Sequence, residues 1–492
     1  MISTKRKLLC VLAVSLFLAS AGYDTTEGID DLILARNIAE GKGLGLSSQE
    51  GPIFDPGPDG RYYLAHEIGN PIFMLPAAVI GRMLPATPTL QQIPRFLAVL
   101  NSVALITLVS VVLFDLWQER FGLNQGIALE ASVALCFGTM LFPYSKTGTD
   151  LVLVSALLVL ALSVPLSASA RSPERGALIL GALLALAFIT RPTAALFAPG
   201  IFVFFLREMW DHHKSVANLV RYGALIAMPV LLGTVWQGWY NHLRTGDALL
   251  PPMMLDRYAH ANRFEVGDPT AALVGLLVSP GKSVFLFSPV LIFGILGIRT
   301  MYKRFPRELL TIVAVIIPYF IFHLFVRNWP GHSGWGPRFL LPLIAPAFIP
   351  AAFWLSEASP RGRRAFKTIA LIGLAVQLAA VWNNPQFRFT VQANEGFPVH
   401  TTVWHPTRNP IADGLVNIVH NIERMMGKRE WDRIPGASEH VQKAANTINV
   451  WWWNTPAKGP VRLILLFLIF GLAVFAKWLW RDLFAEARQL PR

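Results

Sequence analysis

The sequence predicts an all-α polytopic membrane protein with about twelve transmembrane helices and with surface helices in its first outer loop. Of the 492 residues, 53% are hydrophobic and only 15% are charged, whereas soluble domains carry about 25% charged residues. Long apolar runs recur along the chain, and the basic residues behind the net charge of +13 lie in short clusters between them. This distribution follows the positive-inside rule and disfavours a nucleic-acid-binding protein.

Apolar runs long enough, or nearly so, to cross about 30 Å of hydrocarbon define the predicted spans. They lie at residues 7–22, 92–116, 127–143, 149–167, 177–190, 194–206, 219–238, 284–300, 309–326, 338–355, 365–382 and 461–479. The basic start Lys5-Arg6-Lys7 places the N-terminus in the cytoplasm, and alternation then places the other short basic loops and the C-terminus on the same side. We therefore predict a multi-pass protein of the cell inner (plasma) membrane with both termini cytoplasmic.

Two apolar segments near the N-terminus each have two possible interpretations. Residues 1–22 also have the pattern of a signal peptide, with a basic start, an apolar core and small residues before Gly22. Cleavage there would leave the later topology unchanged. Residues 69–84 are apolar as well, but a span there would invert the sidedness of every later loop. We predict a helix that lies on, or dips into, the outer face.

Acidic residues open the first outer loop, which covers residues 23–91. Asp24 and Glu27 precede an expected helix that ends at Gly41. One face of this helix carries Ile29, Leu32, Ile33 and Ala39, and the opposite side carries Glu27 and Asp31. The pattern predicts an amphipathic helix along the membrane surface. A capping role is the alternative for Asp24 and Glu27, because Asp-x-x-Glu is similar to a capping box.

A second polar cluster, His66-Glu67, stands about forty residues further along the same loop, just before Gly69-Asn70-Pro71. A segment rich in glycine and proline, residues 51–60, separates the two clusters and allows the loop to fold back on itself. We expect both clusters to line one cavity at the membrane surface.

These features resemble those of the GT-C membrane glycosyltransferases, especially the protein O-mannosyltransferases and the bacterial aminoarabinose transferases of lipid A. In these families an Asp-Glu pair opens the first outer loop, and a second acid precedes a surface helix that contains proline. Glu27 stands at the place of the Asp, and Glu67 before Pro71 resembles the second acid. The likeness covers most of residues 1–360 and includes the stretches 144–150, 190–193, 279–289 and 334–339.

The resemblance implies an enzyme that moves a sugar from a polyprenyl-phosphate-linked donor to a glycan, lipid or protein acceptor at the outer face. A general base would take the proton of the acceptor hydroxyl, and cations would stabilise the departing lipid phosphate. The catalytic candidates are Glu27, Asp24 and Glu67. The substrate-binding candidates are His66, Lys282, Arg338, Arg191 and Asp150. Snorkelling to the headgroups is the alternative for the cations, and a helix-capping role is the alternative for Asp150.

The resemblance also guides the division of the chain. We predict a GT-C-like catalytic core over residues 1–382, a loop or small cap on the outer face over 383–460, and a last span with a cytoplasmic tail over 461–492. Within the cap we expect helices around 411–426 and 437–447. The tryptophans at 451–453 predict an interfacial aromatic belt, with stacking on a sugar or on donor lipid as the alternative.

Cofactors and partners follow from the same residues. Cys10 and Cys136 lie in apolar runs, so the sequence offers neither a disulfide framework nor a cysteine zinc site. We predict no metal-ligating residues and no defined cofactor, and leave a divalent cation open. The expected partners are the lipid-linked donor, the acceptor and the bilayer, without nucleic acid.

A transporter or flippase of a lipid-linked or amphipathic solute is the alternative function. It would require charged residues near the middle of spans and broken helices in matching halves of the chain. His323 and Gln377 are the polar residues within spans that favour it. A non-catalytic membrane scaffold is a third hypothesis, should the acids serve only as helix caps. We favour the transferase.

Overall fold

The computed structural model describes residues 3–19, 26–51, 54–85, 92–167, 172–254, 265–397, 399–433, 439–454 and 460–489. Within these residues the chain is helical except for its loops and one hairpin of two short strands. The strands β1 (Phe54–Pro56) and β2 (Tyr62–Leu64) pair antiparallel in the first outer loop. The predicted all-α class is confirmed.

Every predicted span overlaps a helix, although the span predicted at 284–300 is divided between α12 (Val284–Phe287) and α13. These helices are α1 (Thr4–Ala19), α4 (Gln92–Asp115), α5 (Gln125–Gly138), α7 (Asp150–Ser167), α8 (Pro173–Thr190), α9 (Ala198–His213), α10 (Val216–Thr245), α13 (Leu291–Arg304), α14 (Pro306–Leu324), α15 (Leu341–Glu357), α16 (Pro360–Val381) and α22 (Pro460–Gln489). Among the described residues, 8 helical segments are long and apolar enough to cross a membrane, and α5 and α7 are shorter apolar helices.

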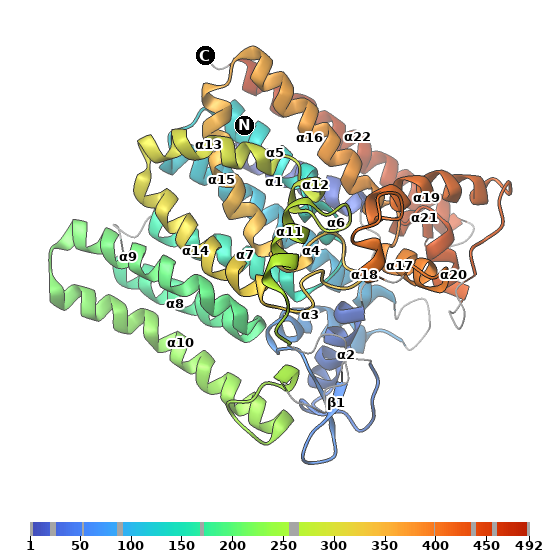
Figure 1. The fold of residues 1–492 in the computed structure, drawn as a ribbon, viewed down its shortest axis with the longest axis horizontal. Helices are drawn as coiled ribbons and strands as arrows, with labels where there is room; N and C mark the ends of the chain where they lie inside the picture. Colours follow the sequence, from blue (N-terminus) through green and yellow to red (C-terminus); the bar gives the residue numbers. More distant parts are fainter. Residues whose placement is uncertain are drawn as a thin grey trace.

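Different segments of the chain lie at the two ends of the helical bundle. Both termini lie at one end, whereas β1, α2 (Thr26–Ala39) and α3 (Gly69–Met83) lie at the other (Figure 1). A chain that starts and finishes at the same end crosses the bundle an even number of times. The arrangement therefore agrees with the even number of spans expected from the charge pattern.

The helix α2 is enclosed by protein, where we expected a helix lying along the membrane surface. Leu34 is buried on one side of it and Leu32 is buried on the opposite side. The Asp31 carboxylate accepts a hydrogen bond from the Asn70 side-chain amide at 2.5 Å, and the same amide donates to the Gly148 carbonyl at 2.9 Å. Asn70, at the start of α3, thus ties α2 to the turn that precedes α7. The contact satisfies one oxygen of a carboxylate that is costly to bury without partners.

The region 383–460 forms a group of short helices beside the bundle (Figure 1). They are α17 (Pro385–Asn394), α18 (Val399–Thr402), α19 (Pro410–Met425), α20 (Glu439–Asn446) and α21 (Trp451–Asn454). The helices expected around 411–426 and 437–447 are confirmed as α19 and α20. The indole N–H groups of Trp451 and Trp452 donate to the carbonyls of Phe17 and Leu18, both at 2.8 Å. Those carbonyls belong to the last turn of α1, where helical partners are lacking.

Close backbone approach holds α13 against α15, and it gives a testable prediction. A Cβ atom on Gly297 would stand 1.9 Å from the Pro350 carbonyl oxygen. Gly297→Ala is therefore expected to push the two helices apart and to cost about 1–3 kcal/mol of stability, as overpacking does. Thermal unfolding in detergent measures this. Gly471→Ala in α22 is the control, because nothing lies within 4 Å of its Cβ position. Equal midpoints for the two variants would contradict the packing account.

Candidate active site

A cavity of about 370 Å³ lies among the end of α8, the end of α14 and the loop that leads into α15. It also receives the segment between β2 and α3. The structure brings together five of the eight predicted site residues in its lining, although they are spread over 273 positions of the sequence from 66 to 338, counting both ends. These residues are His66, Glu67, Asp150, Arg191 and Arg338.

A break in the helical run places Arg191 in this cavity. The helix α8 ends at Thr190, and a 3-10 segment, Pro192–Phe197, leads on to α9. Arg191 itself has extended backbone angles, φ −157° and ψ 112°. Pro192 lacks an N–H and disfavours helical geometry in the residue before it, so the break follows from the sequence. The Arg191 side chain thereby leaves the helix end and reaches the cavity.

Two guanidinium groups and one carboxylate form the polar side of the cavity. The Arg191 Nη1 donates to the Asp150 Oδ2 at 2.7 Å. The Arg191 and Arg338 guanidinium carbons lie 5.2 Å and 5.1 Å from the centre of the Phe339 ring. Both cations therefore lie over the Phe339 ring, at distances where cation–π attraction operates. Arg191, Arg338 and Asp150 together carry an excess of one positive charge in a partly buried setting.

Many of the other residues that line the cavity are apolar. They come from the start of α7, the 3-10 segment after α8, the 251–254 turn and the end of α14: Leu151, Ala195, Leu196, Met253, Met254, Phe322 and Val326. His323, which the sequence marked as a polar residue within a span, also lines the cavity, and its Nδ1 lies 2.8 Å from the Tyr319 carbonyl oxygen. A cavity that combines cations with many apolar lining residues suits an amphipathic anion.

Glu67 forms a buried ion pair with Arg244, a residue that the sequence did not connect to it. The Arg244 Nη2, from the end of α10, donates to the Glu67 Oε2 at 2.9 Å, and the Gln237 side-chain amide donates to the same oxygen at 2.5 Å. Both charged side chains are almost completely buried. Arg244 also donates to the carbonyl oxygens of residues 64, 65 and 66 at 3.3, 3.1 and 2.9 Å. It thus fixes the segment that carries His66 and Glu67.

Lys282 lies outside the cavity lining. It is fully buried, and its ammonium group donates to the carbonyls of His332, Gly334 and Gly336 at 3.0, 2.7 and 3.1 Å. Burial, and to a lesser extent the Arg338 guanidinium, holds the pKa of Lys282 well below its usual range. The lysine therefore organises the loop before Arg338.

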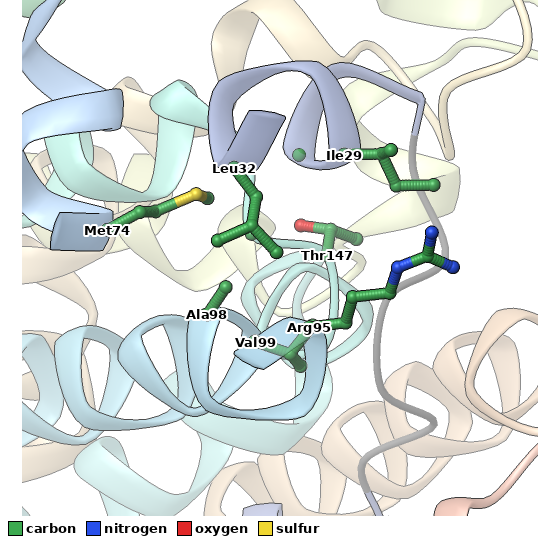
Figure 2. Close-up of a pocket in the computed structure, with 9 residues that line it drawn as sticks. Ile29, Leu32, Met74, Arg95, Ala98, Val99 and Thr147 are labelled. Carbon is green, nitrogen blue, oxygen red and sulfur yellow. The ribbon is translucent and has the colours of Figure 1, made fainter. Parts of the chain in front are cut away.

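The other predicted catalytic residues lie at the start of α2. Asp24 falls outside the described residues, and Glu27 is in the first turn of the helix. The next residue, Gly28, packs against the turn before α7, because a Cβ on Gly148 would stand 4.0 Å from its Cα. Gly28 and Gly148 share a small cavity in which Leu32 of α2 faces Ala98 and Val99 of α4 (Figure 2). The same turn leads within two residues to Asp150.

No cluster of metal ligands accompanies these groups in the part of the chain that the structure describes. Nowhere in it do three or more histidine, cysteine, aspartate or glutamate side chains stand where they could hold an ion.

A protein-family comparison bears on the identity of the site. Residues 90–236 match the model of the family described as dolichyl-phosphate-mannose-protein mannosyltransferase. This part of the chain is thus similar to a family of mannosyltransferases. The matching segment runs from α4 into α10 and contains Asp150 and Arg191.

Solved structures with a similar fold are distant in sequence from this chain. ArnT from Cupriavidus metallidurans, bound to undecaprenyl phosphate, is 16% identical, with a TM-score of 0.48 over 84% of this chain and 73% of ArnT. The oligosaccharyltransferase AglB from Archaeoglobus fulgidus, in complex with an inhibitory peptide and a dolichol-phosphate, is 11% identical, with a TM-score of 0.41 over 89% of this chain and 60% of AglB. No curated protein matches the sequence significantly.

Proposed function

We propose that the protein is a membrane glycosyltransferase of the GT-C type, that it takes its sugar from a polyprenyl-phosphate donor, and that the donor phosphate binds between Arg191 and Arg338. The observation that carries this proposal is the cavity itself, in which two guanidinium groups flank Phe339 and many of the other lining residues are apolar. Arginine binds phosphate oxygens through paired N–H groups. The name of the matching family, with its dolichyl-phosphate-linked mannose, supports the same class of donor.

The general base in this proposal is Glu27, with Asp24 as the alternative. Glu67 is less suited to this role, because the Arg244 guanidinium and the Gln237 amide already bind its Oε2. Packing of Gly28 against Gly148 keeps the start of α2 next to the turn before Asp150. A base there would act on an acceptor hydroxyl, of a glycan, lipid or protein, as it attacks the anomeric carbon.

The reaction is proposed for the outer face of the cell inner membrane. The site lies at the end of the bundle with α2, α3 and β1, away from both termini (Figure 1). The basic residues near the start of α1 and the end of α13, such as Lys5, Arg6, Lys303 and Arg304, mark the other end as cytoplasmic. A donor anchored in the outer leaflet would thus meet the cavity at the membrane boundary.

Binding of the donor tests this assignment. Arg338→Gln is expected to weaken binding of a radiolabelled polyprenyl-phosphate sugar about 10- to 100-fold, because a charge-assisted hydrogen bond to phosphate contributes about 1.5–3 kcal/mol. The matched control is Arg327→Gln, because Arg327 is exposed, pairs with Glu265 and is not part of the lining. Thermal midpoints show that both variants are folded. Donor binding by Arg338→Gln at the wild-type level would refute the proposed phosphate site.

A further inference from the structure

The helix α19 presents its apolar side outward and its polar side to the protein. Asn417 and Asn421 are buried, with exposed fractions of 1% and 0%, whereas Val419 and Ile422 are 55% and 46% exposed. At 100° per residue the two groups lie on opposite faces. The outward stripe continues along the helix and onto its C-cap: Leu415, Val419, Ile422 and Met426. Exposing such a row of apolar side chains to water is unfavourable.

The buried face of α19 fixes the helix to the end of a membrane span. The Asn383 side-chain oxygen accepts hydrogen bonds from the Asn417 and Asn421 amides at 2.9 and 3.1 Å. The Asn383 amide donates to the Gly414 carbonyl at 2.8 Å. A Cβ on Gly414 would stand 2.7 Å from the Ala379 carbonyl oxygen, so the two helices touch through their backbones. Because α16 ends at Val381, α19 lies at the level where that span leaves the hydrocarbon.

The candidate span to which α19 is fixed also carries exposed apolar side chains. On α16, Leu371 and Ile372 are exposed apolar side chains within a span. Two exposed tryptophans, Trp404 and Trp431, stand before and after α19. Lys428 and Arg429 are exposed just beyond its C-terminus. Tryptophan at the headgroup level, with basic residues beside an apolar helix face, is typical of helices that lie in a membrane interface.

We infer that α19 lies in the boundary between headgroups and acyl chains, at the membrane surface opposite the termini. Its occupant is the phospholipid bilayer that surrounds α16. The stripe from Leu415 to Met426 contacts the acyl chains, and Lys428 and Arg429 contact headgroup phosphates. The region 383–433 is then held from two sides, by the amides around Asn383 and by the lipid. This inference stands independently of the proposed donor.

Spin labels on α19 test the inference in the full-length chain, reconstituted as one copy per phospholipid nanodisc. Single cysteines replace Val419 and Ile422 in a Cys10→Ser background, since Cys10 is exposed and Cys136 is buried. Leu371→Cys is the lipid-facing control, and Thr390→Cys is the water-facing control, because Thr390 is an exposed polar residue of α17. Collision with dissolved oxygen is compared with collision with a water-soluble nickel chelate.

The expected result is an oxygen-to-nickel ratio at 419 and 422 close to that at 371 and several-fold above that at 390. A ratio at 419 and 422 equal to that at 390 would place α19 in water and overturn the inference. Labels at 419 and 422 that are shielded from both reagents would also overturn it, because protein would then cover the stripe.

Discussion

Glu27→Gln is expected to abolish sugar transfer while donor binding stays at the wild-type level. Glutamine keeps the size and polarity of the side chain but cannot take up the acceptor proton, and loss of a general base typically costs 10²–10⁴ in rate, by order of magnitude. The measurement is the rate of transfer together with the dissociation constant of a radiolabelled polyprenyl-phosphate sugar.

Matched variants make the Glu27 result specific. Glu40→Gln, directly after the same helix, should transfer at the wild-type rate, because Glu40 is exposed and pairs only with Lys42 in the described contacts. Asp24→Asn should retain transfer if Glu27 is the base. Wild-type transfer by Glu27→Gln would instead mean that the acid serves as a helix cap, and the base would have to be sought among other carboxylates.

Arg244→Met is expected to lower the stability of the protein by about 3–5 kcal/mol, the usual cost of removing one partner of a buried ion pair. The variant leaves the Glu67 carboxylate buried without its cation and removes the donor to the carbonyls of residues 64–66. Chemical or thermal unfolding in detergent measures the loss.

Two further variants separate the causes of that loss. Adding Glu67→Gln to Arg244→Met should recover part of the stability, because the unpaired charge disappears while the carbonyls still lack their donor. Arg327→Met removes an exposed pair with Glu265 and should cost about 0–1 kcal/mol. Similar losses for Arg244→Met and Arg327→Met would show that the buried pair is not what holds this segment.

The spans could be predicted because their signal is local. A run of apolar residues marks a span without knowledge of its neighbours, and the Arg191-Pro192 break follows from the chemistry of proline alone. The helix α2 was expected along the membrane surface, but protein encloses it in the structure. Its wheel shows two faces, but whether lipid or protein covers each face depends on α3 and the hairpin, and Asn70 binds Asp31 from 39 positions away.

The sequence predicted which residues belong to the site better than it predicted the role of each residue. Charged residues beside spans are costly, which singled out Asp150, Arg191 and Arg338. Their grouping in one cavity rests on packing between distant helices. The pairing of Glu67 with Arg244 across 177 positions has no sequence signal in a single chain. Phe339 follows Arg338 directly, yet only the fold brings Arg191 to the same ring.

Donor turnover in membranes that contain the natural acceptors tests the central claim most directly. Wild type and Glu27→Gln would be supplied with a panel of radiolabelled polyprenyl-phosphate sugars, and both bound donor and transferred label would be followed. The account predicts that at least one donor binds to both proteins and that only wild type transfers its sugar. Failure of every donor to bind to folded wild type would contradict it.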